Sequence, residues 1–192
     1  MKKLITVVAV LLFCVAGAAR ADSSRRSSSM SGGTGHEKFF LGVDGDFALP
    51  IGNYSDVNGV GGGLLLVGEY PLMDVLSATA RIGFQYHTDK TVLGADVHMH
   101  SIPILVGAKY YLMPGREGLF GAVEFGAFDL LASASSGGTS ASSSQVKFGG
   151  GVGVGWAMKQ WNARINLHAH DLGSAGDSMM ITAGVGYQFL GL

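Results

Sequence analysis

The chain has 192 residues, of which 47% are hydrophobic, 13 are basic and 14 are acidic. A chain of this length fits a single domain, and the lack of a basic excess argues against a nucleic-acid partner. After residue 21 no run of about 18 apolar residues remains, which excludes a membrane protein built from helices.

The first 21 residues have the features of a secretory signal peptide. Lys2 and Lys3 precede an apolar stretch over residues 4–16, and residues 19–21 form a small-x-small cleavage site. Cleavage would remove Cys14, which is the only cysteine, and would leave ten basic residues against 14 acidic ones. The mature chain would therefore hold no disulfide and no thiolate metal site.

Residues 22–37 form a polar lead before the patterned part of the chain. This stretch is rich in serine and glycine and has no apolar periodicity, so it is too polar to bury a core. We expect a flexible periplasmic leader over 22–37, followed by one domain over 38–192.

From residue 38 onward, eight segments alternate apolar and polar residues with a period of two. Their lengths suit tilted membrane strands, and the chain's 31 glycines recur inside them, as in barrel walls where the backbone needs room. The pattern predicts an all-β fold, an eight-stranded antiparallel up-and-down transmembrane β-barrel, with a soluble β-sandwich as the alternative. The expected strands are 38–49, 59–70, 75–87, 97–112, 118–131, 145–158, 161–170 and 178–190.

The connections between these segments alternate in length. Residues 71–74, 113–117 and 159–160 are short, whereas 50–58, 88–96, 132–144 and 171–177 are longer. Outer-membrane barrels have short periplasmic turns and longer extracellular loops, so we expect both chain ends in the periplasm. We also expect the Ser-rich segment 132–144 to be flexible, because it has no apolar residue large enough to anchor it.

Aromatic residues gather at the strand ends that this topology places near the periplasm. Barrels carry such rings at the boundary between membrane and water, so we interpret these residues as an interfacial girdle. The girdle comprises Phe39, Tyr70, Tyr110, Trp156, Trp161, Tyr187 and Phe189.

The final segment carries a resemblance to a known group. Met179–Phe189 alternates strictly and closes on Tyr187-Gln188-Phe189. Together with the signal peptide and the eight strands, it resembles the small eight-stranded outer-membrane β-barrel proteins of the OmpA/OmpX-like superfamily. The resemblance implies the cell outer membrane, a surrounding of outer-membrane lipid and lipopolysaccharide, and recognition by the barrel-assembly machinery through Tyr187 and Phe189. The chain departs from the pattern because three residues follow the closing phenylalanine.

Charged residues fall in the rows that would face the barrel interior. Such an interior is only wide enough for side chains to fill it, and buried charges are costly unless they are paired. Because four acids balance four bases, we expect a closed internal network rather than a water-filled pore, where one sign often predominates. The predicted network is Asp44, Asp46, Glu69, Arg81, Lys109, Glu124, Lys147 and Arg164.

Two His-x-His pairs have a spacing that can chelate a transition metal. Alternate residues of a strand share a face, so His98 and His100 fall on the apolar face of their strand. His168 and His170 fall on the lumen face of another strand, which is not adjacent to the first. We therefore expect solvated histidines at the outer rim, without a metal or another cofactor.

A lipid A-modifying hydrolase is the enzymatic alternative, because serine, histidine and aspartate occur together near residue 170. Residue types alone do not make a triad, and the segment lacks the His-x-Ser-Asn pattern of lipid A deacylases. The residues concerned are His168, His170, Asp171, Ser174, Asp177 and Ser178.

The sequence therefore predicts a non-enzymatic outer-membrane protein with a largely plugged, charge-balanced lumen and a structural or surface-interaction role. A narrow channel for small solutes is the main alternative, and the oligomeric state is left open.

Overall fold

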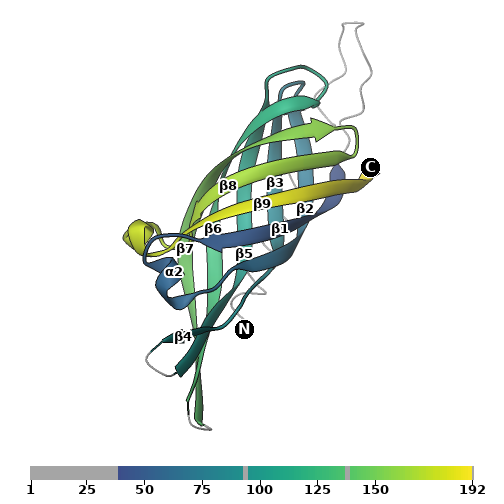
Figure 1. The fold of residues 1–192 in the computed structure, drawn as a ribbon. Helices are drawn as coiled ribbons and strands as arrows, with labels where there is room; N and C mark the ends of the chain where they lie inside the picture. Colours follow the sequence, from purple (N-terminus) through teal and green to yellow (C-terminus); the bar gives the residue numbers. More distant parts are fainter. Residues whose placement is uncertain (1–38, 93–94, 137–138, 192) are drawn as a thin grey trace, which may run out of the picture. The chain divides into compact units, whose positions relative to one another are not determined.

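The computed structural model describes residues 39–92, 95–136 and 139–191. The expected signal peptide (1–21) and leader (22–37) lie outside these residues. The described part of the chain forms one antiparallel sheet of nine strands (Figure 1). Among the described residues, no helix is long and apolar enough to cross a membrane.

Eight of the strands are long, and β4 is a three-residue strand that pairs with β5. The strands are β1 (Phe40–Pro50), β2 (Gly61–Met73), β3 (Leu76–His87), β4 (Lys90–Val92), β5 (Ala95–Tyr111), β6 (Gly118–Ser136), β7 (Thr139–Met158), β8 (Trp161–Ala169) and β9 (Met179–Gly191).

The eight long strands follow each other around a closed barrel. Each pairs with the next long strand along the chain, β3 pairs with β5, and β1 pairs with β9 from Phe40↔Gly191 to Pro50↔Met180. This arrangement confirms the predicted eight-stranded up-and-down barrel. We call the end with the β2–β3, β5–β6 and β7–β8 turns the short-turn end, and the opposite end the long-loop end.

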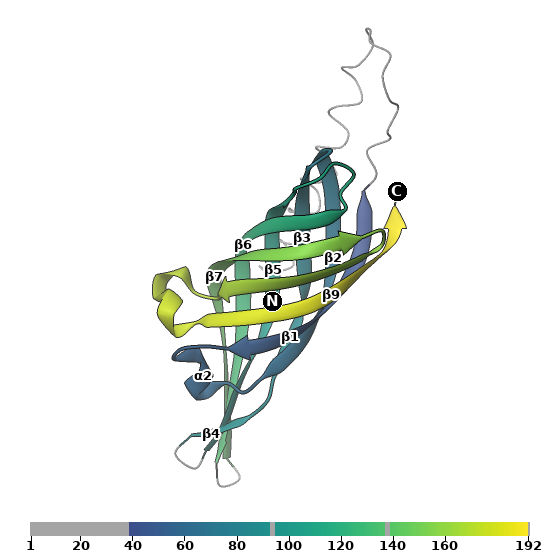
Figure 2. The same cartoon turned by 45° about the horizontal axis from the view of Figure 1, so that its top comes forward.

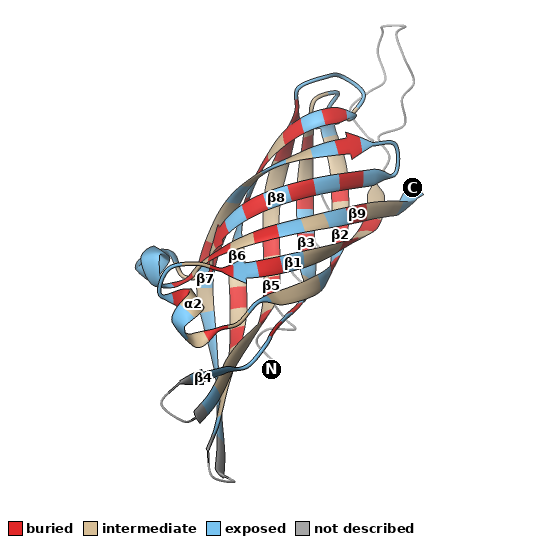
Figure 3. Cartoon of the chain, viewed as in Figure 1, coloured by how far each residue is buried: buried red, intermediate tan, exposed pale blue. Residues whose placement is uncertain are grey.

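Side chains alternate between the two faces of the wall because a strand has a period of two. Along β8, buried and exposed residues alternate strictly, and the same banding is visible on the neighbouring strands (Figure 3). The buried members of β8 are Asn162, Arg164, Asn166 and His168, and the exposed ones include Ile165 and Leu167. Along β8 the wall is thus apolar outside and polar inside, the inverse of a soluble protein.

Glycine is required where bulky side chains fill the narrow interior. Gly155 on β7 faces inward beside Phe120, which is fully buried. A Cβ atom at Gly155 would collide with the Phe120 ring and would lie 2.5 Å from the carbonyl oxygen of Ala163. This close approach explains why the inward row of β7 contains glycines at alternate positions.

The expectation of a flexible segment over 132–144 was wrong for the part of it that the structure describes. Strands β6 and β7 continue their pairing through Ala132↔Ser143 and Ala134↔Ala141 up to Ser136↔Thr139. This hairpin projects beyond the neighbouring strands (Figure 2). Small serine and alanine side chains do not obstruct a ladder, and the backbone hydrogen bonds extend the register already set inside the barrel.

The other long connections also contain regular structure. The helix α2 (Tyr54–Val57) lies between β1 and β2, and the 3-10 helix η1 (Leu172–Asp177) lies between β8 and β9. The side chain of Asp171 caps η1 by accepting a hydrogen bond from the Gly173 N–H at 2.9 Å. Two of the long connections thus contain a short helix that fixes part of their backbone.

Candidate functional site

Four charged side chains from four different strands form a closed ring inside the barrel. Arg81 of β3 and Arg164 of β8 each lie between Asp44 of β1 and Glu124 of β6. The arginine Nη2 atoms are each 3.2 Å from Asp44 Oδ2, and the Nη1 atoms donate to Glu124 at 3.0 Å and 3.1 Å. All four side chains are at most 7% exposed. We call this set the lumen ring; its two positive and two negative charges cancel.

A second cluster lies nearer the short-turn end. Glu69 of β2 accepts hydrogen bonds from Lys109 Nζ at 3.0 Å, Tyr111 Oη at 2.8 Å and Gln188 Nε2 at 3.1 Å. Its carboxylate is 1% exposed, and the Lys109 ammonium also lies 5.1 Å from the centre of the Phe120 ring. We call Glu69, Lys109, Tyr111 and Gln188 the Glu69 cluster. A polar cavity of about 150 Å³ adjoins it at this end.

Two of the eight predicted network residues do not join either cluster. Asp46 accepts a hydrogen bond from Gln85 Nε2 at 3.2 Å, and Lys147 lies 2.8 Å from Asp171 at the long-loop end. Lys147 lies beyond Gly150, where the pairing between β7 and β8 begins, so it lies outside the closed part of the wall. The prediction that all eight residues form one network was wrong in this respect.

Aromatic and histidine side chains close the long-loop end of the lumen. Tyr54 of α2 contacts the His87 and His170 rings edge-on, with centroids 6.0 Å and 5.2 Å apart, and Phe128 lies 4.4 Å from His170. His87 Nε2 lies 3.4 Å from Met180 Sδ. We call these five residues the mouth cluster; all are at most 3% exposed.

The histidine expectations need correction. His168 and His170 are buried rather than solvated, because the wall and α2 enclose the lumen row that parity assigned to them. His87 was missed, although it continues the inward row of Arg81 and Gln85 on β3. His98 lies on the outer face with its Nδ1 atom 2.6 Å from Asp89, and His100 stacks on Tyr86 at 4.6 Å.

Within the described ranges, the residues of the metal and hydrolase alternatives are not brought together. No group of three or more His, Cys, Asp or Glu side chains there is placed to hold a metal ion. Ser178 Oγ donates to backbone oxygens of Asp171 and Ser174, and both ring nitrogens of His170 have no hydrogen-bond partner. Ser174 and Asp177 are exposed on η1, whereas His168 points into the lumen.

The predicted aromatic girdle is distributed around the short-turn end of the wall. Tyr110, Trp156, Trp161 and Phe189 are exposed on the outer face, whereas Phe39, Tyr70 and Tyr187 are half-buried. The Trp161 and Tyr187 rings contact each other across β8 and β9 at 4.7 Å, and Tyr187 Oη donates to Gln160 Oε1 at 3.3 Å.

Comparison with known proteins gives a family and a set of structural neighbours. The family model described as outer membrane protein beta-barrel domain matches residues 5–189. Comparison with the curated proteins gives no match.

Among solved structures, the chain is similar to the attachment invasion locus protein Ail of Yersinia pestis, with 16% identity and a TM-score of 0.54 over 80% of this chain and 97% of that one. A second structure of Ail, in complex with the heparin analogue sucrose octasulfate, has 18% identity and a TM-score of 0.53 over the same shares. The N-terminal β-barrel domain of Pseudomonas aeruginosa OprF has 14% identity and a TM-score of 0.50, over 78% of this chain and 97% of that chain. These likenesses concern the fold.

Proposed function

Because the chain belongs to the outer membrane protein beta-barrel domain family, we propose that it is a non-enzymatic barrel of the cell outer membrane with a non-conducting lumen and a partner-binding outer end. The lumen ring carries this proposal. A water-filled pore would leave charged side chains hydrated, whereas Arg81 and Arg164 are each bound to two carboxylates across the interior.

The two other layers support a closed lumen. The Glu69 cluster lies on one side of the lumen ring, and the mouth cluster lies on the other, with Tyr54 inserted from α2. An eight-stranded barrel has little interior beyond the space taken by such side chains. An ion crossing this lumen would have to break charge pairs that are costly to separate in a buried site.

Planar-bilayer recording tests the closed lumen directly. Purified wild-type protein should show no stable conductance, whereas Arg81→Ala should, because it removes one of the two guanidinium groups that fill the lumen between Asp44 and Glu124. Lys147→Ala is the matched control, since its ion pair lies outside the closed wall. Stable conductance from the wild type would favour the narrow channel instead.

The hairpin of β6 and β7 provides the surface for partners. Residues 139–149 of β7 pair with β6 alone, because the pairing with β8 begins at Gly150. Such an edge leaves backbone groups free to bind an extended segment of another chain. Residues 139–149 contain no proline, which would block pairing with another strand, and Lys147 is the only charged residue among them.

The charge of the long-loop end selects among partners. Asp56, Asp89, Asp96, Asp129, Asp171 and Asp177 lie there, and the bases within the described residues of this end are Lys90 and Lys147. This excess of acid favours a basic extended segment over a sulfated polyanion. A sulfated ligand such as the sucrose octasulfate of the Ail complex is therefore not expected to bind this chain.

Surface labelling tests the orientation on which this role depends. The mature chain would contain no cysteine, so a cysteine introduced by substitution would be the only site that a thiol reagent can label. Ser142→Cys on β7 should react with a membrane-impermeant maleimide on intact cells, whereas Glu117→Cys in the β5–β6 turn should not. The reverse pattern would place the hairpin in the periplasm and contradict the proposed role.

The remaining partners are proposed from the family resemblance. Lipid and lipopolysaccharide would surround the exposed outer row, and the barrel-assembly machinery would read Tyr187 and Phe189 on β9.

A further inference from the structure

The outer wall of the barrel contains an apolar groove of about 450 Å³ near the long-loop end. Its sides are formed by outward residues of β6, β7 and β8, and the groove reaches η1 and the start of β9. Gly150 on β7 leaves the floor open, because it has no side chain beside Phe125. The principal lining residues are Val123, Phe125, Val152, Leu167, Leu172 and Met179.

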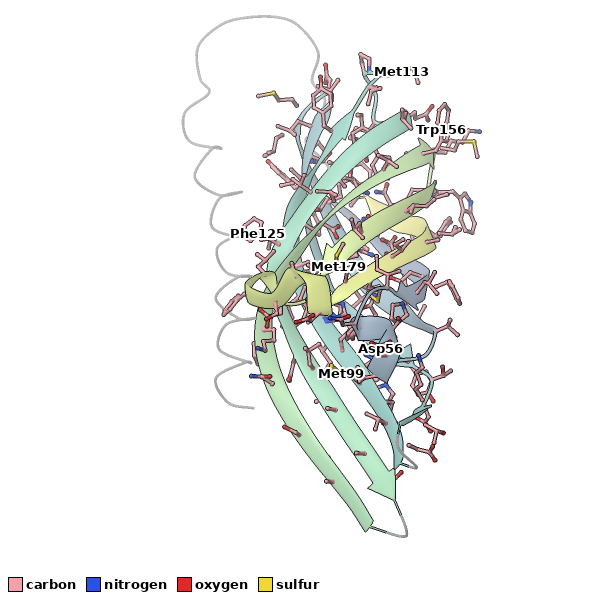
Figure 4. All side chains as sticks on the ribbon, turned by 60° about the vertical axis from the view of Figure 1, so that its left-hand side comes forward. Asp56, Met99, Met113, Phe125, Trp156 and Met179 are labelled. Carbon is pink, nitrogen blue, oxygen red and sulfur yellow. The ribbon has the colours of Figure 1, made fainter. Side chains whose placement is uncertain are left out.

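The short helix η1 is fixed at one end of this groove. Lys147 pairs with Asp171, the Asp171 side chain caps the Gly173 N–H, and Ser178 Oγ donates to two backbone oxygens of the segment. Leu172 is nevertheless 63% exposed although it is a large apolar residue. In Figure 4, η1 lies beside Met179, and Phe125 points away from the barrel. The polar contacts thus hold an apolar side chain out toward the membrane-facing wall.

We propose that this groove binds one acyl chain of lipopolysaccharide, the lipid of the outer leaflet, with η1 as its outer boundary. The inference rests on the orientation in the proposed function, which places the long-loop end in the outer leaflet. The groove is continuous with exposed Val123, Phe125 and Val152, which belong to the membrane-facing row. Its volume lies within the range of about 300–1,000 Å³ that is usual for small-molecule sites.

The side chains that line the groove favour an acyl chain as the occupant. The lining side chains named above are all hydrocarbon or thioether. The two polar lining residues, Glu124 and His168, are buried members of the inward row, so the outward side chains favour an apolar ligand. The adjacent cation, Lys147, is already paired with Asp171. A hydrocarbon chain needs no hydrogen bond and would cover Leu172 and Phe125, which the described part of the chain leaves exposed.

The lipid retained by purified protein tests the proposal. Barrels would be extracted from outer membranes in a mild detergent, and lipopolysaccharide bound to each would be measured by native mass spectrometry. Val152→Trp fills the groove, whereas Val154→Trp places the same ring two residues along β7, outside it; both positions are about equally exposed, at 58% and 60%. Retention should fall about tenfold in Val152→Trp, and Val154→Trp should behave as the wild type.

Each other outcome contradicts the proposal in a distinct way. Equal retention by the two variants would mean that lipid binds the wall without preference for the groove. Retained phospholipid in place of lipopolysaccharide would refute the outer-leaflet source, and a dimer lost only in Val152→Trp would identify a second copy as the occupant. Heat-modifiable gel migration and labelling at Ser142→Cys, measured in both variants, would separate these results from failure to fold or from reversed orientation.

Discussion

Arg81 Nη1 and Glu124 Oε2 lie 3.0 Å apart at the centre of the barrel, although 43 residues separate them in the sequence. Glu124 also accepts from Arg164, so this one carboxylate holds two guanidinium groups together. The contact joins β3 to β6 across the interior, which backbone pairing does not do.

Glu124→Gln should therefore destabilise the barrel strongly. The substitution leaves two buried arginines with the single carboxylate of Asp44, and removing one partner of a buried ion pair typically costs about 3–5 kcal/mol. The free energy of unfolding would be measured by urea titration in detergent micelles. Lys147→Ala removes a partly exposed rim pair and should cost about 1 kcal/mol or less. Similar losses in the free energy of unfolding of both variants would show that the lumen ring contributes no more to stability than the rim pair.

The Glu69 cluster should show energetic coupling between its acid and its base. Lys109→Met leaves Glu69 buried without its ammonium partner, whereas Glu69→Gln together with Lys109→Met removes both charges. The double variant should be more stable than the sum of the single losses predicts, by about 0.5–3 kcal/mol. Strict additivity in the same unfolding assay would mean that the two groups do not interact.

The fold and the facing of its side chains could be predicted from the sequence, because the period of a strand is local information. Parity alone assigned Asp44, Arg81, Glu124 and Arg164 to the inward row. Which acid meets which base depends on the tilt and stagger of the closed barrel, which no local pattern contains. Lys147 shares the inward row but lies beyond the closed wall, so its partner is Asp171.

The loops were harder to predict for a different physical reason. The Ser-rich segment lacks apolar anchors, yet it inherits the register of β6 and β7 and is ordered by backbone pairing. The burial of His87 and His170 likewise depends on Tyr54, which α2 brings from a distant connection. Composition describes how a segment could be stabilised by its own side chains, and here the stabilising contacts come from elsewhere in the chain.

Acid should loosen the mouth cluster. Burial lowers the pKa of His170, which follows β8, from 6.5 to about 3, and nearby His87 adds to the effect. An opened state would take up a proton near pH 6.5, so the closed state is favoured above that pH. It loses stability as the pH falls from 6.5 toward 3, by about 1.4 kcal/mol for each unit.

Hydrogen exchange can follow this opening at α2. The Asn58 N–H donates to Tyr54 O at 3.2 Å, and its protection, corrected for intrinsic exchange, should fall between pH 7 and pH 4.5. His170→Phe should reduce this pH dependence while keeping the contact with Phe128, and buried His87 would remain beside Tyr54. His98→Phe, at a partly exposed position, should leave it unchanged. The same pH dependence in all three proteins would assign the effect to another group.

Phe189 should be needed for assembly in cells more than for stability. Strand β9 continues past it, with Leu190 paired to Leu41 and Gly191 to Phe40, so the closing aromatic lies inside the strand rather than at its end. Phe189 and Phe148 are both outward-facing rings, 51% and 73% exposed, and Phe148 lies on β7 beyond the closed wall, far from the closing strand pair. Replacing either ring by serine removes one exposed outward-facing ring, so the two variants compare a position in the closing strand with a position far from it. If the barrel-assembly machinery reads Phe189, Phe189→Ser should lower the heat-modifiable fraction in outer membranes several-fold, whereas Phe148→Ser should not. Refolding of both purified variants into detergent should be equally efficient; a refolding defect confined to Phe189→Ser would instead assign this ring a role in closing β9 against β1.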